Sequence, residues 1–305
     1  MTPVAVAIFG PTGVGKTALS LELTRDCGEI ISVDSRQIYK YMDIGTAKPT
    51  LDEQKFVKHH LIDIITPDIT YMAGEFKRNS EKLIAEITAR GKIPFLIGGT
   101  GLYFNSLMFG MAEIPAIGHE TKTRLYKKWH RWGQKRMHDI LLRVDPVYGN
   151  KIHWNDKQRT LRALEIFLET GNNFSYFLNS GNIREDITFI NIGLNLDRKI
   201  LYDRINKRVD IMIENGLIDE VKKLLGSGCT KNDPGMKSIG YREIIDYLED
   251  RMSLDEAINL MKKKSRNYAK RQICWFKNMP ETAWFQPDDL TGVKKYLKDK
   301  IPVLI

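Results

Sequence analysis

The sequence has few cysteines and no apolar run long enough to cross a membrane. Its three cysteines, Cys27, Cys229 and Cys274, lie far apart, so their spacing indicates neither a disulfide framework nor a zinc site. This usage is typical of a reducing cytoplasm. The first ten residues are apolar but carry no basic segment, which argues against a secretory signal peptide. Internal repeats and low-complexity segments are also absent, which argues against a repeat architecture.

The residues that are present indicate a soluble, folded protein with a basic surface. The chain has 305 residues, of which 42% are apolar and 28% charged, enough for one large domain or two smaller ones. Its net charge of +9 favours an acidic partner. Two tracts without any acidic residue, Lys122–Arg136 and Lys262–Lys277, hold seven Lys or Arg residues each.

A glycine-rich loop near the start is the most informative feature of the chain. Its pattern, G-x-x-x-x-G-K-T, is that of a phosphate-binding loop, which needs a strand before it and a helix after it. The apolar Val4–Phe9 and the helix-forming Ala18–Leu23 supply both. Backbone N–H groups and the helix N-terminus would bind phosphate oxygens, while Lys16 adds a cation and the Thr17 hydroxyl a ligand for Mg²⁺. The expected diphosphate-binding residues are Gly10, Pro11, Thr12, Gly13, Val14, Gly15, Lys16 and Thr17.

Four short apolar runs have the length and composition of buried parallel strands. Segments long enough for helices separate the first three, which is the βαβ rhythm of a parallel sheet. In such sheets ligands bind beyond the carboxyl ends of the strands. The loops after the first three runs are therefore expected to converge on one site. The runs are Val4–Phe9, Glu29–Val33, Ile93–Ile97 and Phe189–Leu194.

A helical insertion interrupts this rhythm. Residues 112–186 show helical patterns and no convincing strand, and the fourth run then resumes the sheet. We therefore expect an α/β fold, with a P-loop-type parallel sheet flanked by helices, an inserted all-helical domain and a helical C-terminal region. Residues 1–111 and 187–305 would form the core. Helices are predicted at about 156–170, 198–225, 238–250 and 254–276.

Three further groups of residues could carry chemistry, and each has a structural alternative. Asp34, after the second run, could hold Mg²⁺ or act as a general base, or it could cap a helix. The glycines of Gly98–Gly101 could let a ligand approach the backbone beside Thr100, or could simply form a strand-to-helix turn. Arg204 and Arg208, four residues apart, could clamp phosphate oxygens or lie on a solvated basic face.

The second basic tract, Lys262–Lys277, also contains Tyr268, Trp275 and Phe276. Basic side chains bind a nucleic-acid backbone, and aromatic rings stack on unpaired bases. The alternative is a helix whose rings pack inward beneath a solvated face, although its cations would still repel one another without an anionic partner. Two such tracts on a phosphate-binding protein are unusual for an enzyme of small metabolites.

Eight segments, in order along nearly the whole chain, match the motifs of one known family. They are Gly10–Thr17, Asp34–Tyr39, Gly45–Pro49, His59–Asp63, Gly98–Tyr103, Gln158–Glu165, Ile239–Glu243 and Tyr268–Gln272. On these motifs the chain resembles the bacterial tRNA dimethylallyltransferases, the tRNA isopentenyltransferase family. Cys274 departs from the threonine usual in relatives, and the zinc finger that extends eukaryotic relatives is not expected.

The resemblance implies an enzyme that transfers a dimethylallyl group from dimethylallyl diphosphate to N6 of the adenosine just 3′ of the anticodon. The phosphate loop and Arg208, with Mg²⁺, would hold the diphosphate leaving group. Lys16, Thr17, Thr100 and Asp34 would be catalytic, with Asp34 as the general base. The target base must leave the anticodon stack at a cost of about a few kcal/mol, so contacts to the flanking loop must offset it.

The resemblance also implies which residues contact tRNA. Thr100, Lys122 and Arg124 resemble positions that line the channel where donor and base meet. No obligate protein partner is indicated, so a cytoplasmic monomer is expected. The full set is Asp34, Ser35, Arg36, Gln37, Thr100, Lys122, Arg124, Gln158, Arg159, Thr160, Leu161, Arg162, Lys237, Ser238, Ile239, Gly240, Tyr241, Arg242, Lys270, Arg271, Gln272, Ile273, Cys274, Trp275, Phe276 and Lys277.

Three other functions remain open from the residues alone. A small-molecule kinase could use the same loop and fold, and a plant-type adenylate prenyltransferase would pass the same donor to a free nucleotide. A nucleotide-regulated RNA-binding protein would use Asp34 as a Mg²⁺ ligand without any transfer chemistry. The basic tracts favour tRNA prenyl transfer over the first two. The sequence does not rank dimethylallyl against longer donors, because pocket depth is a three-dimensional property.

Overall fold

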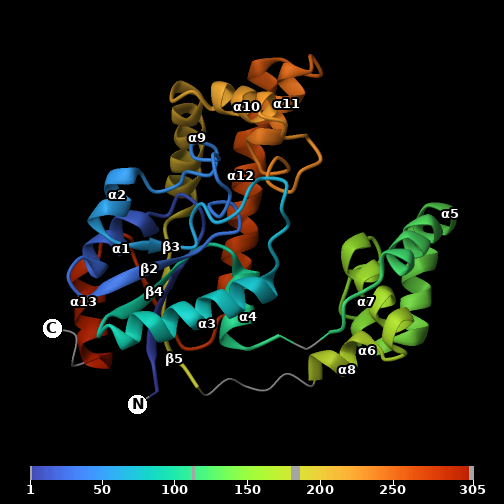
Figure 1. The fold of residues 1–305 in the computed structure, drawn as a ribbon, viewed down its shortest axis with the longest axis horizontal. Coiled ribbons are helices and arrows are strands. Elements are labelled where there is room, and N and C mark those ends of the chain that lie inside the picture. Colours follow the sequence, from blue (N-terminus) through green and yellow to red (C-terminus); the bar gives the residue numbers. More distant parts are fainter. Residues whose placement is uncertain (1, 112–113, 180–185, 302–305) are drawn as a thin grey trace. The chain divides into compact units, whose positions relative to one another are not determined.

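The structure, a computed structural model, describes residues 2–111, 114–179 and 186–301. The chain forms two compact units (Figure 1), one comprising Met1–Met108 with Glu185–Ile305 and the other Phe109–Arg184. None of the helices in these described ranges has the length and hydropathy of a membrane-spanning segment.

The first unit is built on a parallel sheet with the strand order β3-β2-β4-β1-β5-β6. All four predicted strands are present. Two further strands, β3 of two residues and β6 of four, extend the edges of the sheet and are too short to give a pattern in the sequence. The strands are β1 (Val4–Phe9), β2 (Gly28–Val33), β3 (His59–His60), β4 (Ile93–Gly98), β5 (Thr188–Leu194) and β6 (Thr282–Phe285).

Helices cover both faces of this sheet, and the alternation along β1 shows how. Ala7 and Phe9 pack with α3, α4 and the end of α12, whereas Val6 and Ile8 face the other way and pack with α1, α9 and α13. The helices of this unit are α1 (Lys16–Thr24), α2 (Leu51–Phe56), α3 (Ala73–Ala89), α4 (Gly101–Met108), α9 (Arg198–Glu214), α10 (Leu217–Gly226), α11 (Tyr241–Leu248), α12 (Leu254–Phe276) and α13 (Leu290–Lys300).

Glycines set two helix boundaries that differ from the prediction. The single helix expected over 198–225 is wrong: Gly216 adopts a left-handed conformation (φ 93°), so that α9 ends before it and α10 begins after it. The helix expected over 238–250 begins at Tyr241, because Gly240 has φ 100°. Helix α12, which lies beside α9 in Figure 1, has the predicted bounds.

A separate core joins α10, α11 and the first half of α12 to the segment that follows the second strand. Tyr241, Leu217 and Met261 pack with Ile38 and Tyr39 in this cluster. It fixes the chain beyond β2 against the helices.

The described residues of the second unit are helical, as expected for the insertion. The first basic tract lies in α5, where Gly133 interrupts the helix with φ 77° and ψ 166°. Asp156 caps α7 by accepting the N–H of Arg159, and Gly171 ends it. The helices are α5 (His119–Val144), α6 (Pro146–Gly149), α7 (Lys157–Thr170) and α8 (Phe174–Asn179).

Candidate active site

The phosphate-binding loop joins β1 to α1 at the carboxyl edge of the sheet. Gly13 and Gly15 have φ of 79° and 113°, a region that favours glycine, and this lets the loop curl. The Lys16 ammonium lies inside the loop. It donates hydrogen bonds to the carbonyl oxygens of Gly10 and Pro11, both at 3.0 Å. The loop is thus closed around the cation that the sequence predicted to meet the phosphate.

Lys16 belongs to a group of three charged side chains from different elements. Burial lowers the pKa of Lys16 to about 8, the carboxylate of Asp34 counteracts part of that fall, and the guanidinium of Arg208 adds to it. Burial also lowers the pKa of Arg208, again against the effect of Asp34. Two cations and one carboxylate therefore interact electrostatically at this edge of the sheet.

Both arginines of α9 reach the phosphate loop. Arg208 Nη1 donates to the hydroxyl of Thr12 at 3.2 Å, and Arg204 Nη1 donates to the carbonyl oxygen of Val14 at 3.3 Å. Arg208 is half-buried, whereas Arg204 is exposed. The geometry favours a phosphate-clamping role over a solvated basic face, most clearly for Arg208.

Asp34 lies in a turn that follows β2, not at the start of a helix. Its Oδ1 accepts the backbone N–H groups of Arg36 at 2.8 Å and Gln37 at 3.4 Å. One carboxylate oxygen thereby holds the turn. The helix-capping alternative is wrong for this residue, because residues 35–38 form a turn.

Thr100 connects this turn to α12. The N–H of Ser35 donates to the Thr100 hydroxyl at 3.1 Å, and the Thr100 side chain also hydrogen-bonds to the phenol of Tyr268. Burial raises the pKa of Tyr268 to about 12, and the nearby carboxylate of Asp34 acts in the same direction. Tyr268 is therefore a neutral phenol beside Thr100, a position that the sequence did not assign to it.

The glycines after β4 make room for α12. A Cβ on Gly99 would lie 2.2 Å from Nε2 of Gln272, and one on Gly101 would lie 2.4 Å from Cδ1 of Trp275. The space beside these two glycines is therefore occupied by side chains of α12, and not by the ligand that was one of the two possibilities from the sequence.

Side-chain hydrogen bonds also fix the segment that follows Asp34. Gln37 uses both ends of its amide, accepting from the Ser32 hydroxyl at 3.0 Å and donating to the Ala47 carbonyl at 3.1 Å. Nearby, Glu220 at the start of α10 accepts the N–H groups of residues 43–45 and the hydroxyl of Tyr241. The turn is therefore supported from the helices as well as from the sheet.

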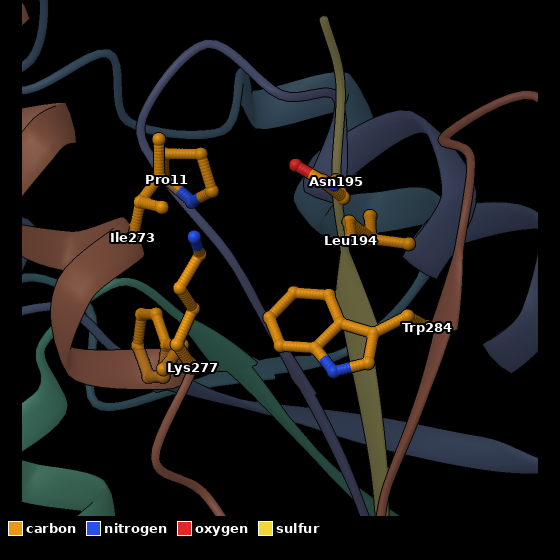
Figure 2. A pocket seen from close by; sticks show the side chains of 7 residues that line it. Pro11, Leu194, Asn195, Ile273, Lys277 and Trp284 are labelled. Carbon is orange, nitrogen blue, oxygen red and sulfur yellow. The ribbon is translucent and has the colours of Figure 1, made fainter. Parts of the chain in front are cut away.

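A cavity of about 250 Å³ lies against Pro11, near the start of the phosphate loop (Figure 2). Its walls are mostly apolar, and the Lys277 amine points into it. It shares Pro11 with the phosphate loop but includes neither Lys16 nor Asp34. Its lining is Pro11, Leu194, Asn195, Ile273, Phe276, Lys277 and Trp284.

Comparison with known proteins identifies the family. The family model described as IPP transferase matches residues 37–279. The chain belongs to the IPP transferase family. A tRNA dimethylallyltransferase from Thermotoga petrophila is 45% identical over 298 residues, 96% of each chain. The crystal structure of the full-length tRNA isopentenylpyrophosphate transferase from Bacillus halodurans has a TM-score of 0.72 at 40% identity, covering 99% of this chain and 97% of that one. A eukaryotic dimethylallyltransferase, described as acting on tRNA, has a TM-score of 0.81 at 28% identity, over 97% and 77%.

These relatives confirm the family that the motifs indicated, the α/β fold and the class of enzyme, a transferase. The phosphate loop precedes the stretch matched by the family model, which begins at residue 37. The relatives align with 96% or more of this chain, a longer stretch than the family model matches.

The residues of this IPP transferase that are expected to contact tRNA range from buried to exposed. Six are buried: Thr160, Ser238, Gly240, Tyr241, Gln272 and Phe276. Eight are half-buried: Asp34, Ser35, Gln37, Thr100, Leu161, Arg162, Ile239 and Ile273. The exposed members present their side chains to solvent and carry most of the positive charge. They are Arg36, Lys122, Arg124, Gln158, Arg159, Lys237, Arg242, Lys270, Arg271, Cys274, Trp275 and Lys277.

The oxygen donors beside the phosphate loop fit a magnesium ion held mainly by its substrate. In the described parts of the chain no group of three His, Cys, Asp or Glu residues could cage a metal. Mg²⁺ commonly takes one or two protein oxygens together with phosphate oxygens and water. The exposed hydroxyl of Thr17, in the first turn of α1, and the carboxylate of Asp34 are suitable donors.

Proposed function

We propose that this protein transfers a dimethylallyl group from dimethylallyl diphosphate to N6 of the adenosine 3′ of the anticodon in tRNA. One observation carries the proposal: a phosphate loop with two cations, Lys16 and Arg208, stands beside the carboxylate of Asp34 in a chain 45% identical to a tRNA dimethylallyltransferase. Such an arrangement has a place for an anionic leaving group and, next to it, a proton acceptor.

The leaving group is the diphosphate. As the allylic C–O bond breaks, positive charge develops on carbon and negative charge on the bridging oxygen. Loop N–H groups, Lys16 and Arg208 stabilise that negative charge, which is where electrostatic catalysis is most effective. A magnesium ion held by Thr17 and the diphosphate oxygens would neutralise further charge there.

Asp34 is the general base. The exocyclic N6 of adenine is a poor nucleophile because its lone pair is delocalised into the ring. As N6 forms its bond to the allylic carbon it becomes more acidic, and a carboxylate of Asp34 accepts the proton that it loses. Since Oδ1 is held by the turn, Oδ2 is the oxygen left to do so.

The acceptor is bound by exposed cations. Lys270 and Arg271 lie on the exposed side of α12, and the Arg271 guanidinium stands 5.7 Å from the ring of Tyr268. Contacts of this kind to the anticodon loop would offset the cost, about a few kcal/mol, of turning the base out of its stack. The exposed cations of α5 add a second basic surface on the helical unit.

The test is a labelling experiment with three parallel reactions. Labelled dimethylallyl diphosphate and Mg²⁺ are incubated with unmodified tRNA and, in parallel, with AMP and with ATP plus candidate metabolites. We expect label on tRNA and none on AMP. Label on AMP would indicate an adenylate prenyltransferase, and ATP consumption without label transfer would indicate a kinase. Binding of tRNA without any turnover would leave an RNA-binding protein.

A further inference from the structure

A single buried amide joins two loops of the site. Gln272 of α12 is 6% exposed. Its Oε1 accepts the backbone N–H of Thr12 in the phosphate loop at 2.8 Å, and its Nε2 donates to the carbonyl oxygen of Gly99 at 2.8 Å. These partners lie 260 and 173 residues away in the sequence. The amide is therefore a bridge between the loop after β1 and the loop after β4.

The chemistry of its partners fixes the orientation of this amide. A backbone N–H can only donate, and a backbone carbonyl can only accept. Rotating the amide by half a turn would place NH₂ against the Thr12 N–H and oxygen against the Gly99 carbonyl, and would lose both bonds. Neither aspartate, asparagine nor an apolar side chain can replace glutamine here, because the position requires one donor, one acceptor and this length.

Each partner of Gln272 is connected to a different part of the proposed reaction site. At one end, the Thr12 hydroxyl accepts a hydrogen bond from Arg208, so Gln272 and Arg208 hold the same residue of the phosphate loop. At the other end, Gly99 precedes Thr100, whose hydroxyl accepts the N–H of Ser35. Ser35 in turn follows the proposed base in the chain.

We propose that Gln272 is a positioning residue that sets the spacing between the diphosphate of the donor and the acceptor side of the site. The proposal rests on the proposed prenyl transfer. Transfer requires the allylic carbon and N6 to meet within about 3–3.5 Å, and a misplacement of about 1 Å can cost roughly a hundredfold in rate. A rigid amide between the two loops supplies such spacing, whereas long flexible side chains would not.

The test replaces Gln272 with methionine, which keeps the length and volume but removes both hydrogen bonds. The matched control is Gln54→Met in α2. Gln54 also donates to a backbone carbonyl, that of Pro49 at 2.8 Å, but lies outside the site. Single-turnover transfer is measured at saturating donor and tRNA, and the dissociation constants of tRNA and of inorganic diphosphate are measured separately.

We expect the Gln272→Met rate at saturation to fall roughly 10- to 100-fold, with both dissociation constants within threefold of the wild type. Hydrogen exchange of the Thr12 amide should become faster, while Gln54→Met changes the rate less than twofold. A role in folding alone would instead lower the fraction of active protein and leave the rate of that fraction unchanged. That result, or a rate within twofold of the control, would overturn the proposal.

A second variant covers the case in which methionine prevents folding. Gln272→Asn keeps a polar amide but is one methylene too short to reach both Thr12 and Gly99, so the rate at saturation should again fall at least 10-fold. An unchanged rate would reject the bridge. If the wild-type protein transferred no label to tRNA, the proposed function would fail. Faster hydrogen exchange of the Thr12 amide in the Gln272 variants would still show, independently of transfer, that Gln272 holds the phosphate loop.

Discussion

Replacing Asp34 with asparagine removes the proposed base while keeping the oxygen that holds its turn. Oδ1 accepts the N–H groups of Arg36 and Gln37 in this structure, and the amide oxygen of asparagine can accept the same two bonds. The substitution exchanges only Oδ2 for an NH₂ group. Loss of a general base typically costs about 10²- to 10⁴-fold. We therefore expect turnover to fall at least 100-fold.

An indirect effect through Lys16 must be separated from this loss. The Asp34 carboxylate helps to maintain the pKa of Lys16, which is about 8, so the variant carries a less basic lysine. If that pKa fell by a further two units, roughly 3% of the lysine would stay charged at pH 7.5 instead of roughly three quarters, a loss of about 25-fold. A decrease of 100-fold or more is thus too large to come from Lys16 alone.

The assay is single-turnover transfer from labelled dimethylallyl diphosphate to tRNA at pH 7.5 and again at pH 6, with tRNA affinity measured alongside. The asparagine variant should stay slow at both pH values and bind tRNA within twofold of the wild type. Recovery at pH 6 to within threefold of the wild-type rate would show that Asp34 acts through Lys16. A near-normal rate at pH 7.5 would remove Asp34 from the chemistry.

Three other outcomes follow from the charges of the structure. Replacing Lys270 and Arg271 with alanine should weaken tRNA binding and reduce its dependence on salt concentration, measured by filter binding between low and moderate salt. Unchanged binding would show that these two residues do not contact tRNA. Affinity for inorganic diphosphate, measured by calorimetry, should fall up to roughly eightfold between pH 7.5 and 9. The reason is that the pKa of Lys16 is about 8, so the lysine loses its charge over this range. The Lys16→Met variant should show no such fall. Burial alone would raise the pKa of Glu29, but hydrogen bonds from His60 and an arginine lower it to about 2. The ionised Glu29 therefore stabilises the folded state by about 2 kcal/mol. This contribution is present above about pH 4.5 and is lost as pH falls toward 2. Urea unfolding at pH 7 should show that Glu29→Gln has lost it.

The sequence predicted the parts of the site whose signals are local. The phosphate loop is recognisable because its glycines and lysine stand between a strand and a helix. Asp34 and Thr100 could be placed beside it because parallel strands bring their carboxyl ends to one edge. The reach of Arg208 to Thr12 was open in the sequence, since spacing along a helix does not tell which element that helix faces.

The sequence could not place Gln272 and Tyr268, whose partners lie far away in the chain. Gln272 was grouped with the exposed basic residues around it, yet it is buried. One signal was available: Tyr268, Gln272 and Phe276 recur at intervals of four, the spacing of one helix face. The break at Gly216 was missed for a related reason, because a glycine inside a helical pattern does not reveal whether its φ will be positive.

Helix α12 therefore carries two functions within one basic tract. A helix turns 100° per residue, so neighbours in the sequence fall on different faces. Lys270 and Arg271 are exposed, while Gln272 beside them is buried and bridges the loops. Substitutions on the exposed face should change tRNA affinity and its salt dependence, and those on the buried face should change the rate of the bound complex. Adjacent residues in this tract would then control different quantities, the affinity for tRNA or the rate of transfer. The pattern of charges along the sequence does not distinguish the two roles.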